Sequence, residues 1–66
     1  MSLSKCIVRI LLSDGRTVYF VSWTEDGFRW TNSDEAAREV SYYDFFNIKE
    51  RLEEYDGVEA VYYDTI

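Results

Sequence analysis

The pair Asp14-Gly15 constrains the fold more than any other feature, because it separates two runs of sequence that are typical of β-strands. The runs KCIVRILL and RTVYFVSWT are rich in β-branched and aromatic residues. Asp-Gly is a preferred sequence for a two-residue type I′ turn, in which both central residues need a positive φ angle. The pattern therefore predicts an antiparallel hairpin whose turn is Asp14-Gly15.

A two-residue turn fixes which side chains of the hairpin share a face. Counting outward pairs Leu12 with Thr17, and pleating places paired residues on the same face of the sheet. One face is nearly all apolar, so we expect it to be the core side, with Cys6, Val8, Ile10, Leu12, Thr17, Tyr19, Val21 and Trp23. The outer face then carries Ile7, Arg9, Leu11, Val18 and Phe20.

A third strand and a helix follow the hairpin. The turn signal over 25–27 predicts a short strand over 28–30. Ser41 is a suitable N-cap, with Asp44 at the third helical position. The following apolar residues recur at helical spacing and predict a helix that ends near Gly57, with a stripe of Phe45, Ile48, Leu52 and Tyr55.

The segment 33–40 has its own start signal, so it forms either a separate turn or the beginning of the main helix. We favour a break before Ser41. The run VEAVYYDTI predicts a final strand, which we expect to lie parallel to a neighbour. The expected fold is thus α+β in the order β-β-(β)-α-β, a small sheet with one main helix packed on one face.

The chain of 66 residues is short enough for a single domain, 1–66, with 1–4 expected as a flexible N-terminus. Its one cysteine rules out an internal disulfide and favours a reducing compartment. We find no apolar run near the length of a membrane span, about 20 residues, and no signal peptide. These features predict a cytoplasmic protein that does not bind membranes.

Residue types that carry chemistry are scarce. There is no histidine, which is the commonest general base and metal ligand. We see no glycine-rich phosphate loop and no complete calcium-binding loop. Cys6 has no histidine to activate it and is expected to be a small buried apolar residue. We therefore expect no enzymatic activity, no catalytic or metal-binding residue and no cofactor.

Charge is unevenly distributed, with a net charge of +1 in residues 1–33 and −7 in residues 34–66. Because phosphate backbones repel such a chain, we do not expect direct binding to nucleic acid. Five acids form a candidate acidic surface: Glu50, Glu53, Glu54, Asp56 and Glu59. These acids either solubilise the protein or imitate nucleic-acid phosphates, so an acidic inhibitor or DNA mimic of a nucleic-acid-processing protein is the alternative function.

The outer face of the sheet is the candidate interface, because it holds more apolar side chains than exposure to water alone requires. Its residues are Ile7, Arg9, Leu11, Val18 and Phe20, extended by Phe28 and Trp30. A simpler interpretation is that Arg9 covers the ring of Phe20 in a cation–π pair. The preferred function is a small non-enzymatic interaction module that binds itself as a homodimer or binds another protein.

The segment WTNSDEAAREVSYYDFFNIKERL resembles small bacterial, phage and prophage proteins over about a third of the chain. In that pattern a Trp-Thr pair precedes a spaced alanine, a short β residue and a serine N-cap of an amphipathic helix. The matching residues here are Trp30, Thr31, Ala36 or Ala37, Val40 and Ser41, followed by Phe45, Ile48 and Leu52. The resemblance implies a β-hairpin-plus-helix fold, often encoded by mobile elements, and assigns no catalytic residue.

Overall fold

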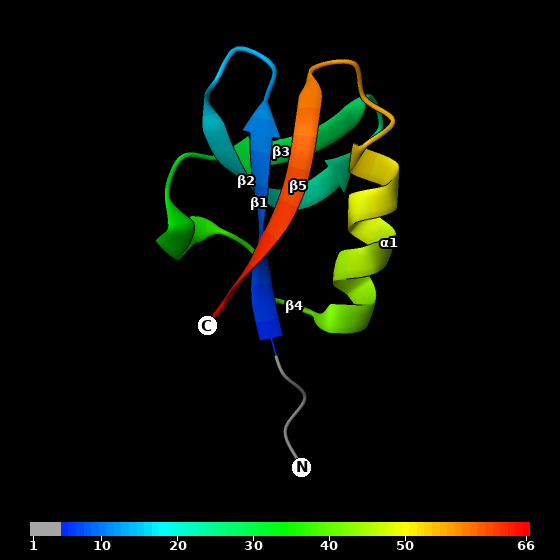
Figure 1. Cartoon of the computed structure of the whole chain (residues 1–66). Coiled ribbons are helices and arrows are strands. Elements are labelled where there is room, and N and C mark those ends of the chain that lie inside the picture. Colours follow the sequence, from blue (N-terminus) through cyan, green and yellow to red (C-terminus); the bar gives the residue numbers. More distant parts are fainter. Residues whose placement is uncertain (1–4) are drawn as a thin grey trace.

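The computed structural model describes residues 5–66, so the predicted flexibility of 1–4 lies outside the described residues. Five strands and one α-helix form an α+β domain, which confirms the predicted class and order (Figure 1). The elements are β1 (Lys5–Leu12), β2 (Thr17–Thr24), β3 (Gly27–Thr31), β4 (Val40–Ser41), α1 (Tyr42–Leu52) and β5 (Val58–Thr65), with a 3₁₀ helix over Asp34–Ala36. No helix within 5–66 has the length and apolar character needed to cross a membrane.

Strand β1 is the centre of the sheet. It pairs antiparallel with β2 on one side and with β5 on the other, while β3 extends the sheet beyond β2. The short β4 pairs with the start of β1 and leads into α1, which then runs in the same direction as β1 (Figure 1). The chain must therefore return in the opposite direction, so β5 is antiparallel and the predicted parallel strand is wrong.

The hairpin loop between β1 and β2 contains three residues, not the predicted two. The N–H of Gly15 donates to the carbonyl of Leu12 at 3.0 Å, and the N–H of Leu12 donates to the carbonyl of Arg16 at 2.8 Å. Gly15 has a φ of 93°, as expected for a type I turn that is followed by a left-handed glycine. Leu12 therefore faces Arg16, and the next core pair is Ile10 with Val18.

This one-residue shift exchanges the two faces of β2, because side chains alternate with a period of two. Val18 and Phe20 are core residues with 0% and 2% exposure, so their predicted place on the outer face is wrong. Tyr19 and Val21, which were predicted to be in the core, are only partly buried. The faces of β1 are as predicted, with Cys6, Val8 and Ile10 fully buried.

An irregularity between β2 and β3 brings Trp23 back to the core side. Two steps along β2, from Phe20 to Ser22, match a single step along β3, so Val21 is an extra residue. Such a bulge reverses the alternation of side chains beyond it. Trp23 consequently packs edge-on against Phe20, with ring centroids 4.9 Å apart, and Phe28 lies against both rings.

The helix begins as predicted and ends earlier. The Asp44 N–H donates to the Ser41 hydroxyl at 3.2 Å, which confirms the N-cap, and the separate 3₁₀ turn confirms a break before Ser41. α1 ends at Leu52, and Tyr55 lies beyond it with its ring against Phe28. The core between helix and sheet comprises Cys6, Val8, Ile10, Val18, Phe20, Val40, Phe45, Ile48, Leu52 and Val61.

Candidate interaction surface

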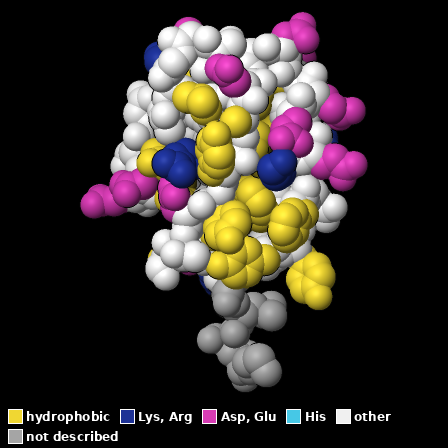
Figure 2. Space-filling model, viewed as in Figure 1, with side chains coloured by type: hydrophobic (Ala, Val, Ile, Leu, Met, Phe, Trp, Pro, Cys, Tyr) yellow, Lys and Arg dark blue, Asp and Glu magenta, His cyan; other side chains and the backbone are white. Residues whose placement is uncertain are grey.

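Exposed aromatic rings gather where α1 begins, beside the second half of β5 (Figure 2). Tyr43 is 81% exposed, Phe46 61% and Tyr63 46%, and Tyr42 is partly buried beside them. We call Tyr42, Tyr43, Phe46 and Tyr63 the aromatic surface. Three of its rings come from the first two turns of α1, and the fourth comes from β5, the strand next to that helix.

Two rings of the aromatic surface, Phe46 and Tyr63, contact the buried ring of Phe45. The Tyr63 ring meets Tyr42 and Phe45 edge-on, each at a centroid distance of 5.2 Å. Phe46 lies 5.4 Å from Phe45 in a similar arrangement. Edge-to-face contacts of this kind are the favoured geometry for aromatic pairs. Because Phe45 is buried, it holds Tyr63 and Phe46 in place at the surface.

The sequence indicated part of this surface. Neighbouring helical residues point about 100° apart, so Tyr42, Tyr43 and Phe46 could not all share the buried stripe with Phe45. At least one of the three was therefore expected on a flank or at the surface, and this is confirmed. The contribution of Tyr63 was missed, because it depends on β5 running antiparallel beside the helix.

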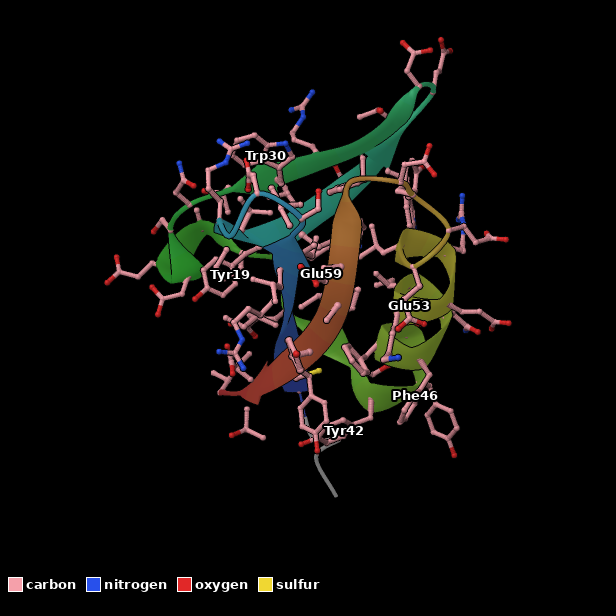
Figure 3. The ribbon with its side chains drawn as sticks, turned by 45° about the horizontal axis from the view of Figure 1, so that its top comes forward. Tyr19, Trp30, Tyr42, Phe46, Glu53 and Glu59 are labelled. Carbon is pink, nitrogen blue, oxygen red and sulfur yellow. The ribbon has the colours of Figure 1, made fainter. Side chains whose placement is uncertain are left out.

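The predicted outer-face interface is only partly assembled. Ile7, Arg9 and Leu11 share the face of β1 that points away from α1, and Tyr19 of β2 lies on that side (Figure 3). Val18 and Phe20 are absent from it because they are buried in the core. The outer face has therefore lost the two apolar residues of β2 on which its assignment as a docking surface depended.

Two other residues of the predicted interface, Arg9 and Phe28, have partners within the chain. Arg9 lies 3.5 Å from the Asp64 carboxylate and 5.2 Å from the centre of the Tyr62 ring, so its cation–π partner is not Phe20. Phe28 is partly buried and packs against the core. Trp30 remains 43% exposed. Arg9 is thus engaged with β5 and Phe28 with the core, so the predicted residues do not form one continuous surface.

The five acids of the predicted acidic surface are all exposed. They lie in the second half of α1, in the loop after it and at the start of β5. Figure 3 labels two of them, Glu53 and Glu59. Glu53 forms an ion pair of 2.6 Å with Lys49, one helical turn earlier. Figure 2 shows acidic side chains on the same side of the molecule as the aromatic rings. Glu50 lies one helical turn after Phe46 in α1, so the acidic surface adjoins the aromatic surface there.

Few other groups within residues 5–66 could react or bind a metal ion. Cys6 is buried as predicted, and burial raises the pKa of its thiol, so the less reactive protonated form is favoured. Within residues 5–66, no three acidic, histidine or cysteine side chains come together as a metal site would require. No protein-family model, curated protein or solved structure matches this chain.

Proposed function

We propose that the chain is a small non-enzymatic interaction module that binds a basic partner protein through the aromatic surface. The observation that carries this proposal is the grouping of Tyr43, Phe46 and Tyr63, each at least 46% exposed, on one side of a small domain. Contiguous exposed apolar patches mark interaction sites, and tyrosine and phenylalanine are enriched in the central parts of interfaces. The contacts with Phe45 hold the rings of Phe46 and Tyr63 in place before binding, which lowers the entropy lost on association.

A basic partner fits this surface better than a second copy of the chain. Residues 34–66, which supply the whole aromatic surface, carry a net charge of −7. Two copies that meet through this surface would bring their acids together, and like charges oppose association. Lysine and arginine side chains, in contrast, are attracted both to carboxylates and to the faces of aromatic rings.

An acidic inhibitor of a nucleic-acid-processing protein is the second candidate. The observation that favours it is the row of exposed acids beside the aromatic surface, which includes Glu50, Glu54 and Glu59. A partner with a nucleic-acid groove would supply the basic charge that this row needs. An origin in a phage or prophage, which the sequence resemblance implies, would be consistent with such a target. DNA would compete with the module only in this case.

Binding of a synthetic peptide that alternates leucine and lysine tests the preferred function. We expect the ring protons of Tyr43 and Phe46 to shift in NMR spectra during titration. Phe46→Ser should weaken binding by about tenfold or more, as loss of a central aromatic anchor does. Trp30→Ser is the matched control, because Trp30 is also an exposed ring but lies on β3 at the other end of the molecule (Figure 3).

Three results would contradict the proposal. The first is a peptide affinity that Phe46→Ser and Trp30→Ser change equally. The second is binding that does not weaken at high salt, because attraction between charges must be screened. The third is a dimer in analytical ultracentrifugation that Phe46→Ser dissociates, since a second copy would then occupy the aromatic surface. Competition by duplex DNA for a DNA-binding enzyme would support the second candidate instead.

A further inference from the structure

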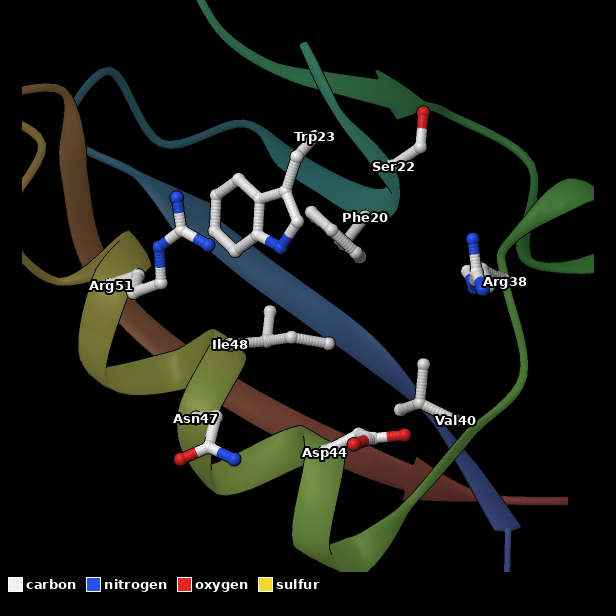
Figure 4. A pocket seen from close by; sticks show the side chains of 9 residues that line it. All are labelled: Phe20, Ser22, Trp23, Arg38, Val40, Asp44, Asn47, Ile48 and Arg51. Atoms are coloured by element: carbon white, nitrogen blue, oxygen red, sulfur yellow. The ribbon is translucent and has the colours of Figure 1, made fainter.

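A pocket of about 270 Å³ lies on the opposite flank of α1 from the aromatic surface, between the helix and β2 (Figure 4). The proposed partner binding does not use it. Its apolar part is formed by Phe20, Val40 and Ile48, all buried members of the core. The side chain of Trp23 stands at its edge. The pocket therefore offers an apolar floor and an aromatic wall to a small molecule or a single side chain.

Two arginines line this apolar floor from different elements. Arg51 of α1 lies with its guanidinium 4.0 Å from the centre of the Trp23 ring. Arg38 comes from the segment before β4, where its backbone N–H donates to the carbonyl of Phe20 at 3.2 Å. In Figure 4 the two arginines lie on either side of the opening. The Arg51 guanidinium is thus held against Trp23, and the Arg38 backbone is held against β2.

Neither arginine forms an ion pair within residues 5–66, although acids outnumber basic residues in the chain by 13 to 7. The ion pairs within residues 5–66 join Arg9, Arg16 and Lys49 to acids and do not include Arg38 or Arg51. A guanidinium presents a planar fork of donors that matches a carboxylate. A pair of such groups above an apolar floor forms the receptor for an anion with an apolar body.

We propose that this pocket binds a small organic carboxylate whose apolar body rests on Phe20 and Ile48. A singly charged ligand fits better than a phosphate dianion, because the Asp44 side chain also lines the pocket and repels negative charge. The volume is slightly below the range of pockets that hold drug-sized molecules, about 300–1,000 Å³, so the ligand is small. The carboxylate pairs with Arg51, Arg38 attracts it from the other side of the opening, and the Trp23 ring covers the apolar body.

Titration with 3-phenylpropionate tests the proposal, since its carboxylate is joined to one ring by a short chain. Trp23 reports binding by fluorescence, with Trp30→Phe as the background so that Trp23 is the only tryptophan. We expect saturable binding with a dissociation constant of about millimolar, as befits so few atoms. The neutral 3-phenylpropionamide, which has the same shape, should bind at least about tenfold more weakly because it lacks the charge.

Variants on the rim separate pairing with arginine from simple partition into an apolar site. Arg51→Gln should weaken binding of 3-phenylpropionate about tenfold, and Arg38→Gln should weaken it by less. Arg29→Gln, which changes an exposed arginine of β3 outside the pocket, should leave it unchanged. Asp44→Asn should strengthen binding, because it removes a like charge and keeps the backbone N–H that Ser41 accepts. Equal affinity for acid and amide, no saturable signal, or no difference between the Arg51 and Arg29 variants would overturn the proposal.

Discussion

The register of the β1–β2 hairpin predicts that Phe20→Ala destabilises the fold far more than Tyr19→Ala. Phe20 is 2% exposed, and its ring packs against Trp23 and Phe28 at centroid distances of 4.9 and 6.3 Å. Removing a buried phenylalanine costs about 3–5 kcal/mol. Since Phe20 also loses two aromatic pairs, worth about 0.5–1.5 kcal/mol each, we expect a value in the upper half of that range.

A loss of this size is close to the whole stability of such a chain. At about 0.05–0.15 kcal/mol per residue, a domain of 66 residues has a free energy of unfolding of about 3–10 kcal/mol. We therefore expect Phe20→Ala to unfold the domain or to lower its melting temperature by more than about 12 °C. Tyr19 lies partly buried on the outer face, so Tyr19→Ala should cost about 1 kcal/mol, the typical value for a point substitution.

Urea unfolding, monitored by circular dichroism, gives the free energy of unfolding of both variants. Phe20→Leu serves as a third variant, because it keeps most of the apolar volume and should remain folded. In a hairpin with a two-residue turn, Tyr19 would be in the core and Phe20 outside it. The order of the two costs would then be reversed. A Tyr19→Ala variant that is as unstable as Phe20→Ala, or less stable, would therefore refute the register and the face assignments that follow from it.

Three further predictions concern local structure. Gly15→Ala should destabilise the protein by about 1–2 kcal/mol in urea unfolding, because Gly15 has a φ of 93°. An added Cβ would meet no atom within 4 Å, so the variant tests backbone strain alone. Gly15→Asn should cost less, because asparagine tolerates a positive φ better than alanine does. Ser41→Ala should cost about 1 kcal/mol through loss of the bond to the Asp44 N–H, and Ser41→Asp should restore it; equal stability of the alanine and aspartate variants would contradict the cap. Hydrogen bonds from Arg16, first from its backbone N–H and then from its side chain, hold the pKa of Asp14 below its usual value. The stabilisation from Asp14 is therefore present above its unfolded-state pKa and is lost as the pH falls through the folded-state pKa, so wild type and Asp14→Asn should differ in stability at neutral pH and converge in acid.

Much of the fold was predictable because several local signals agree. The β-branched runs, the serine cap at Ser41 and the stripe of Phe45, Ile48 and Leu52 each point to the element that forms. The faces of β1 were also predicted correctly, since its apolar residues alternate clearly. These signals involve residues that are close in sequence, so they do not depend on how distant strands pair.

The faces of β2 could not be predicted, because Asp14-Gly15 suits a loop of two residues and also a loop of three. In both loops Gly15 adopts a positive φ, so the dipeptide alone does not decide between them. The choice depends on two bonds from Arg16 to the Asp14 carboxylate and on the core volume that Phe20 fills. Because side chains alternate with a period of two, this single residue exchanges the faces of the β2 side chains that precede the bulge at Val21.

Which face Phe20 occupies also decides what the two proposed sites share. With Phe20 inside, its ring contributes to the core and to the floor of the pocket that Arg38 and Arg51 border. The aromatic surface, in contrast, is anchored by Phe45 on the other flank of α1 and has no contact of its rings with Phe20. Because only three residues of α1 are buried, both flanks of this short helix stay accessible. A change of register in β2 therefore alters the pocket directly, while the aromatic surface depends on the packing of α1 against β5 and on the pairing of β5 with β1.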